Sequence, residues 1–181
     1  MNKQARQNTT LVRPLANSYW VIPALLLAGE HPAGAEAAQL PTRLQQLLRA
    51  GIDSYIDLTE VGEQPEYRHL LPGHVEYLRC GIADTCVPNN VSQTREVLAA
   101  IHSALARGRR VYVHCRAGIG RTGLIVGCFL AEEDRNGGRA IKRLNALWRQ
   151  SARAVSWPKV PQTAEQADYI RRWPKLRTLG S

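Results

Sequence analysis

The fold is decided by one stretch of sequence, His114-Cys115-Arg116-Ala117-Gly118-Ile119-Gly120-Arg121-Thr122. It follows a β-branched run at 110–113 and precedes an apolar run from Leu124, which predicts a buried strand, a loop and a helix. Two glycines let the loop point successive N–H groups into one concavity. The helix adds its first amides and the positive end of its dipole. The stretch therefore predicts a phosphate-binding loop between a strand and a helix.

Cys115 and Arg121 give this loop its chemistry. The Arg121 guanidinium can contact two phosphate oxygens at once. The same positive field favours the thiolate form of Cys115, which is an activated nucleophile. We expect Cys115 to attack phosphorus while the loop holds the phosphate oxygens, through Arg116, Ala117, Gly118, Ile119, Gly120 and Arg121.

The run 118–123 also fits the G-x-G-x-x-G fingerprint of dinucleotide-binding proteins. That fingerprint requires a second strand that ends in an acidic residue about 20 positions later. Here the predicted helix ends in Glu132-Glu133-Asp134, and a further helical pattern follows Gly137-Gly138. The fingerprint also gives Cys115 no role. We therefore reject a dinucleotide-dependent oxidoreductase.

The pattern His-Cys-x5-Arg-Thr resembles the signature of the cysteine-dependent phosphatases, the protein tyrosine and dual-specificity superfamily. Its form is most similar to the compact dual-specificity branch. The resemblance is good over residues 81–173 and loose over the first third of the chain. It implies an α/β domain, a phosphocysteine intermediate, and neither metal nor other cofactor.

The resemblance also implies roles for residues outside the loop. Asp84, four residues before Pro88, takes the place of the general acid, although loop aspartates often only begin turns or cap helices. Gln162 matches the glutamine that orients water in the second half-reaction. We expect the neighbouring Thr163 and Gln166 to form a capping box for the next helix.

Smaller roles follow from position. Thr122 is close enough in sequence to hydrogen-bond the Cys115 sulfur, and His114 matches a residue that helps to fix the loop and the thiol. Either could instead be an ordinary structural residue. Glu60 and Glu63 could brace Arg121, but we expect them to be solvated loop residues.

The other cysteines, Cys80, Cys86 and Cys128, lack the C-x-x-C spacing of zinc sites, so no metal is expected. Cys128 falls on the apolar side of its helix and is predicted to lie in the core. Cys86, two residues past Asp84, is a candidate for a protective disulfide with oxidised Cys115.

The 181 residues predict a basic, flexible arm at 1–17 and one phosphatase domain at 18–181. The longest apolar stretch, 20–28, contains Pro23 and is too short to span a bilayer. Residues 1–13 do not resemble a secretory signal. A thiolate enzyme needs reduced cysteine, which favours a cytoplasmic location.

Hydrophobic periodicity predicts an α/β fold with a central, mostly parallel sheet flanked by helices. The predicted strands are 19–22, 25–28, 52–58, 75–80 and 110–114, and the predicted helices are 41–49, 91–107, 121–135, 139–149 and 164–175. We expect the last three helices to pack on one side of the sheet.

The predicted activity is metal-independent hydrolysis of phosphomonoesters, with phosphotyrosine in proteins as the main substrate and some capacity for phosphoserine and phosphothreonine. The net charge of +9 favours anionic substrates. A phosphoinositide or RNA 5′-phosphate stays an alternative, although the loop carries no lysine and no specific nucleic-acid partner is assigned. A non-catalytic phosphate-binding module is a further alternative, but it would have no use for the retained Cys115, Asp84 and Arg121.

Overall fold

The computed structural model describes residues 12–178, and its centre is a five-stranded sheet. The strands are β1 (Ser18–Ile22), β2 (Leu26–Gly29), β3 (Ser54–Asp57), β4 (Glu76–Arg79) and β5 (Val111–His114), in the spatial order β1-β2-β5-β3-β4. Only the β1–β2 pair is antiparallel in this sheet; the other three pairs are parallel. The predicted mostly parallel sheet is confirmed.

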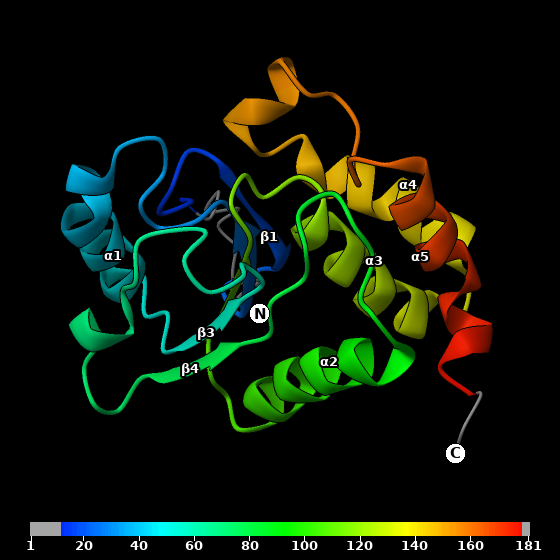
Figure 1. The fold of residues 1–181 in the computed structure, drawn as a ribbon, viewed down its shortest axis with the longest axis horizontal. Coiled ribbons are helices and arrows are strands. Elements are labelled where there is room, and N and C mark those ends of the chain that lie inside the picture. The colour runs from blue at the N-terminus through cyan, green and yellow to red at the C-terminus, as the bar shows by residue number, and fades with distance from the viewer. Residues whose placement is uncertain (1–11, 179–181) are drawn as a thin grey trace, which may run out of the picture.

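Helices cover both faces of the sheet (Figure 1). They are α1 (Leu40–Arg49), α2 (Val91–Ala106), α3 (Arg121–Asp134), α4 (Gly137–Trp148) and α5 (Ala164–Leu176), with a 3-10 turn at Ala152–Val155. Helix α1 packs on one face, and α2 joins the last three helices on the other. The expectation that the last three helices share one side is confirmed.

Alternation along the strands divides the core between these faces. In β1, Tyr19 and Val21 belong to the cluster under α2–α5, whereas Trp20 between them belongs to the cluster under α1. In β2, Leu27 points to the α1 side in the same way. Cys128 is fully buried in the larger cluster, as predicted. The sheet is therefore buried on both faces, as in other α/β proteins.

The predicted strand and helix boundaries lie within two residues of the observed ones, and two of the predicted bounds need a physical explanation. Helix α4 begins at Gly137 rather than at 139, because the Asn136 side chain accepts a hydrogen bond from the Arg139 amide and caps the helix. The predicted arm at 1–17 extends too far, since Leu15 is buried and its carbonyl accepts a 2.6 Å hydrogen bond from Ser18. Residues 1–11 lie outside the described residues. Within 12–178, no helix combines the length and apolar character needed to cross a membrane.

The parallel strands place three loops at one edge of the sheet. His114, the last residue of β5, is paired with Gly29 at the end of β2 and with Asp57 at the end of β3. The segments that follow these strands therefore meet beside the predicted phosphate loop. In open α/β sheets, ligands bind at this carboxyl edge.

Candidate active site

The loop after β5 joins the strand directly to α3. Cys115 lies at its start and is only 3% exposed, and Arg121 is the first residue of α3. The helix has Gly120 at its N-cap and no capping side chain, whereas α2, α4 and α5 are capped by Asn90, Asn136 and Thr163. The first amides of α3 are therefore available to an anion.

Gly118 is required by both its conformation and its surroundings. Its φ of +76° is one that side chains disfavour. A β-carbon there would lie 2.6 Å from the Gly29 carbonyl carbon. The backbone of His31 donates a 3.0 Å hydrogen bond to the Arg116 carbonyl. The end of β2 therefore supports the loop from below.

Arg121 is buried and fixed. Its Nη1 and Nη2 donate to the two carboxylate oxygens of Glu63 at 2.7 and 2.5 Å, and Nη1 also donates to the Ile82 carbonyl at 2.9 Å. Burial alone would lower the pKa of Arg121, but the Glu63 hydrogen bonds and the negative charge of Cys115 outweigh it and raise the pKa. The guanidinium is therefore held as a cation close to Cys115.

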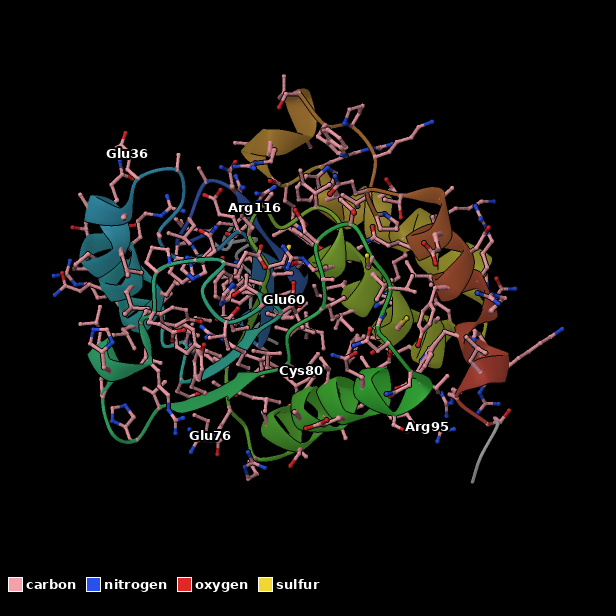
Figure 2. The ribbon with its side chains drawn as sticks, viewed as in Figure 1. Glu36, Glu60, Glu76, Cys80, Arg95 and Arg116 are labelled. Atoms are coloured by element: carbon pink, nitrogen blue, oxygen red, sulfur yellow. The ribbon has the colours of Figure 1, made fainter. Side chains whose placement is uncertain are left out.

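Asp84 lies beside both arginines of the loop. Its carboxylate is 3.0 Å from Nη2 of Arg121 through one oxygen and 3.0 Å from Nη2 of Arg116 through the other. Arg116 is labelled in Figure 2, where it lies between α1 and α3 in the view. The Asp84 side chain is 41% exposed, so it stands at the mouth of the site. The structure thus brings together the predicted acid and both arginines of the loop.

The start of α5 reaches the same loop. A β-carbon on Gly120 would lie 3.0 Å from the side-chain oxygen of Gln162 and 3.1 Å from the side-chain nitrogen of Gln166. Gln166 completes the predicted capping box with Thr163. It also donates a 3.0 Å hydrogen bond to the carbonyl of Cys86. Gln166 therefore connects the segment that carries Asp84 to α5.

His114 is fully buried beneath the loop. Burial lowers its pKa, although the nearby Asp57 carboxylate opposes this effect. The Tyr67 hydroxyl lies 2.5 Å from Nε2, and Nδ1 lies 3.3 Å from the Cys115 carbonyl. These contacts fit an Nδ1–H tautomer that accepts from Tyr67 and donates to Cys115. The ring thus ties the backbone of Cys115 to the core.

Asp57 completes this network. Its oxygen Oδ1 accepts hydrogen bonds from the amide and hydroxyl of Thr59, and Oδ2 accepts a 2.7 Å hydrogen bond from Tyr77. Burial alone would raise the pKa of Asp57, but His114 and these hydrogen bonds lower it to about 2. A buried carboxylate therefore stays ionised 3.9 Å from the imidazole of His114.

Comparisons with known proteins agree with this geometry. The family model of the dual specificity phosphatase catalytic domain matches residues 36–148. The chain belongs to this family. The chain is 36% identical over 94 residues to "Putative tyrosine phosphatase 067L" of Invertebrate iridescent virus 3, a match that covers 49% of this chain and 38% of the viral protein.

The chain is also similar to a phosphatase named for a lipid substrate and to solved structures. It is 28% identical over 102 residues to phosphatidylglycerophosphate phosphatase PTPMT1 of Arabidopsis thaliana, which covers 53% of this chain and 29% of that one. It spans less than two fifths of the length of these curated relatives. The active form of Tk-PTP has a TM-score of 0.72 at 21% identity, covering 88% of this chain and 97% of Tk-PTP.

One predicted contact near the loop differs. We expected Thr122 to hydrogen-bond the Cys115 sulfur, but its hydroxyl donates to the Gly29 carbonyl at 3.4 Å. The reason is that Thr122 lies in the first turn of α3, where the end of β2 packs against the loop. In this structure Thr122 connects α3 to β2.

Glu63 was judged wrongly from the sequence. We expected a solvated loop residue, but its side chain is 18% exposed and binds both terminal nitrogens of Arg121. The hydrogen bonds from Arg121 lower the pKa of Glu63 and outweigh the opposing effect of burial. Asp57 and Tyr67 also belong to the network around His114, and no role was predicted for either residue from the sequence. The position of Asp57 at the end of a strand next to β5 was a usable signal.

Glu63→Gln is expected to lower kcat/KM about 10- to 100-fold, which corresponds to about 1.4–2.7 kcal/mol. The neutral side chain would hold the Arg121 guanidinium less firmly and in a less defined orientation. The measurement is steady-state kinetics on an aryl phosphate. Glu133→Gln is the matched control, because Glu133 pairs with Arg143 at the far end of α3 from the loop. Equal effects of the two substitutions on kcat/KM would contradict a positioning role for Glu63.

Proposed function

We propose that this chain is a metal-independent phosphatase that removes phosphate from tyrosine, and to a lesser extent serine and threonine, in phosphorylated proteins. One observation carries the proposal. The carboxylate of Asp84 lies 3.0 Å from the guanidinium of Arg121, at the mouth of a loop with Cys115 at its base and uncapped helix amides beside it. A nucleophile, an acid and an oxyanion site are therefore assembled in one place.

In the first step, the Cys115 sulfur attacks phosphorus and the bond from phosphorus to the leaving oxygen breaks. Asp84 donates a proton to that oxygen, while Arg121 and the loop amides hold the three other oxygens. The incoming phosphoryl group competes with Asp84 for the arginines. Its negative charge also favours the protonated form of the adjacent carboxyl. Substrate binding therefore prepares the acid for its role.

In the second step, water attacks the phosphorus of the phosphocysteine. Gln162 orients the water, and Asp84, now ionised, accepts its proton. The phosphorus–sulfur bond breaks, which releases inorganic phosphate and regenerates the thiolate. The closeness of Gln162 to Gly120 supports this assignment, because it places the amide beside the loop.

Several observations support a protein substrate. The viral relatives are named as tyrosine phosphatases. Arg116 is the basic side chain of the loop besides Arg121, and no lysine occurs there. The four cysteines are free thiols, which supports a reducing compartment such as the cytoplasm. The sequence similarity to a phosphatidylglycerophosphate phosphatase makes a phospholipid headgroup the second candidate.

A panel of four substrates tests the proposal. Rates are compared for a phosphotyrosine peptide, a phosphothreonine peptide, a phosphoinositide and a 5′-phosphorylated RNA, each with and without a chelator. We expect the highest kcat/KM for the phosphotyrosine peptide and no effect of the chelator, because no step uses a metal. A higher kcat/KM for the lipid or the RNA would overturn the protein assignment.

A further inference from the structure

A groove of about 850 Å³ lies outside the catalytic loop, between α4, the segment 156–163 and α5. Its apolar lining comes from both helices and from the segment between them. Figure 1 shows this segment, in orange, returning from the end of α4 to the start of α5. The apolar lining residues are Ile141, Trp157, Pro158, Val160, Pro161, Ala164 and Ala167.

Four cations line this groove, and no carboxylate does: Lys142, Arg149, Lys159 and Arg171. Arg171 pairs with Asp168, but the other three form no ion pair with a described carboxylate. Arg143, beside Lys142 on α4, is instead paired with Glu133 and Asp134. On α4, the arginine outside the groove lining is therefore paired with carboxylates. The cations of α4 that line the groove have no described ion-pair partner.

The groove opens beside the catalytic loop. Gln162 lines it and also lies against Gly120, where its side-chain oxygen is 3.0 Å from the position of a β-carbon on that glycine. A substrate bound through its phosphoryl group at Cys115 would have the neighbouring part of its chain next to this opening.

The spacing of the cations indicates an elongated ligand. Lys142 and Arg149 are seven residues apart, which corresponds to about 10 Å along a helix. An extended peptide covers that length with about three residues. A single phosphate group is smaller than this spacing, so it would meet fewer of these cations than a run of carboxylates. The lining therefore fits a ligand with several negative charges in a row.

We propose that this groove binds an acidic segment of the phosphorylated protein, adjacent in its sequence to the residue that is dephosphorylated. Carboxylates of the segment would meet Lys142, Arg149 and Lys159, and aliphatic side chains would pack on the apolar lining. RNA fits less well, because Trp157, 39% exposed, is the one aromatic ring in the lining, whereas single strands stack on several. The inference rests on the proposed function.

The test compares phosphotyrosine peptides that carry four glutamates or four glutamines on either side of the phosphotyrosine. For the parent protein we expect the KM of one glutamate peptide to be about tenfold lower than that of its glutamine counterpart, because several exposed ion pairs act together. Lys142→Glu combined with Lys159→Glu should remove this preference. Arg49→Glu combined with Arg172→Glu is the matched control, with the same charge change on exposed residues outside the groove.

The outcomes separate the two proposals. If the parent protein hydrolyses neither p-nitrophenyl phosphate nor the phosphopeptides, the proposed function is contradicted. Normal turnover with equal KM for glutamate and glutamine peptides would contradict only the groove, as would an equal loss of preference in the control variant. Single-stranded RNA that inhibits the parent more strongly than the glutamate peptide, but not the Lys142→Glu/Lys159→Glu variant, would reassign the groove to nucleic acid.

Discussion

Cys115→Ser is expected to lower turnover by about 10⁴-fold or more while phosphopeptide binding is retained. A serine hydroxyl stays protonated near pH 7 and is a far weaker nucleophile than a thiolate, so the attack on phosphorus is lost. The loop should keep its shape, because it is held by Gly118 against Gly29 and by the His31–Arg116 hydrogen bond rather than by the sulfur. The measurements are single-turnover kinetics and calorimetric titration with a phosphopeptide.

Cys86→Ser is the control for this substitution. Cys86 is exposed, and its contact with Gln166 is made by the backbone carbonyl, so the substitution should leave turnover unchanged. Turnover that persists in Cys115→Ser would exclude a phosphocysteine intermediate. Loss of turnover together with loss of binding would show instead that the loop had collapsed, and the thermal unfolding of the variant would reveal this.

Asp84→Asn is expected to slow hydrolysis by about 10²- to 10⁴-fold for esters with poor leaving groups, the usual contribution of a general acid. Esters such as p-nitrophenyl phosphate should be slowed far less, since their leaving oxygen departs without a proton. The measurement is the dependence of kcat/KM on the leaving group across a series of aryl phosphates. The slope should become steeper in the variant than in the parent.

Glu60→Gln is the control for Asp84→Asn. Glu60 is an exposed carboxylate, and its described hydrogen bonds to Glu63 are made by its backbone N–H and carbonyl, so its side chain should not affect the slope. Equal slowing of all esters by Asp84→Asn would reassign the acid. Such a result would leave Asp84 the role seen here, an ion-pair partner of Arg116 and Arg121.

The sequence predicted the fold and the strand, loop and helix around Cys115 well because both are encoded locally. The strand, loop and helix around Cys115 are contiguous, and the glycines, the cysteine and the arginine stand at fixed spacing. The five strands and five helices also follow from periodicity within short windows. Errors at the start of α4 and at Leu15 arose from a cap and from a single buried side chain. Neither has a periodic signal.

The rest of the candidate site depends on distant segments. Glu63 and Arg121 are 58 residues apart, and nothing around Glu63 distinguishes it from the exposed Glu60 three residues earlier. The Thr122 hydroxyl has two candidate acceptors, the sulfur of Cys115 and the carbonyl of Gly29. Only the packing of β2 against α3 determines which of them accepts its hydrogen bond. Gln166 was predicted as a cap, but its second hydrogen bond reaches the carbonyl of Cys86, 80 residues away.

The uncapped start of α3 has a thermodynamic consequence for the protein as a whole. Its first amides have no capping side chain, and the buried Nε of Arg121 has no hydrogen-bond partner among the described residues. Without a bound anion, these N–H donors therefore lack described side-chain acceptors. A tetrahedral oxyanion would supply acceptors and negative charge at this position. An anion that binds only the native state shifts the equilibrium between folded and unfolded protein toward the native state. We therefore expect the conformational stability of this chain to rise with the concentration of inorganic phosphate, the product of the proposed reaction.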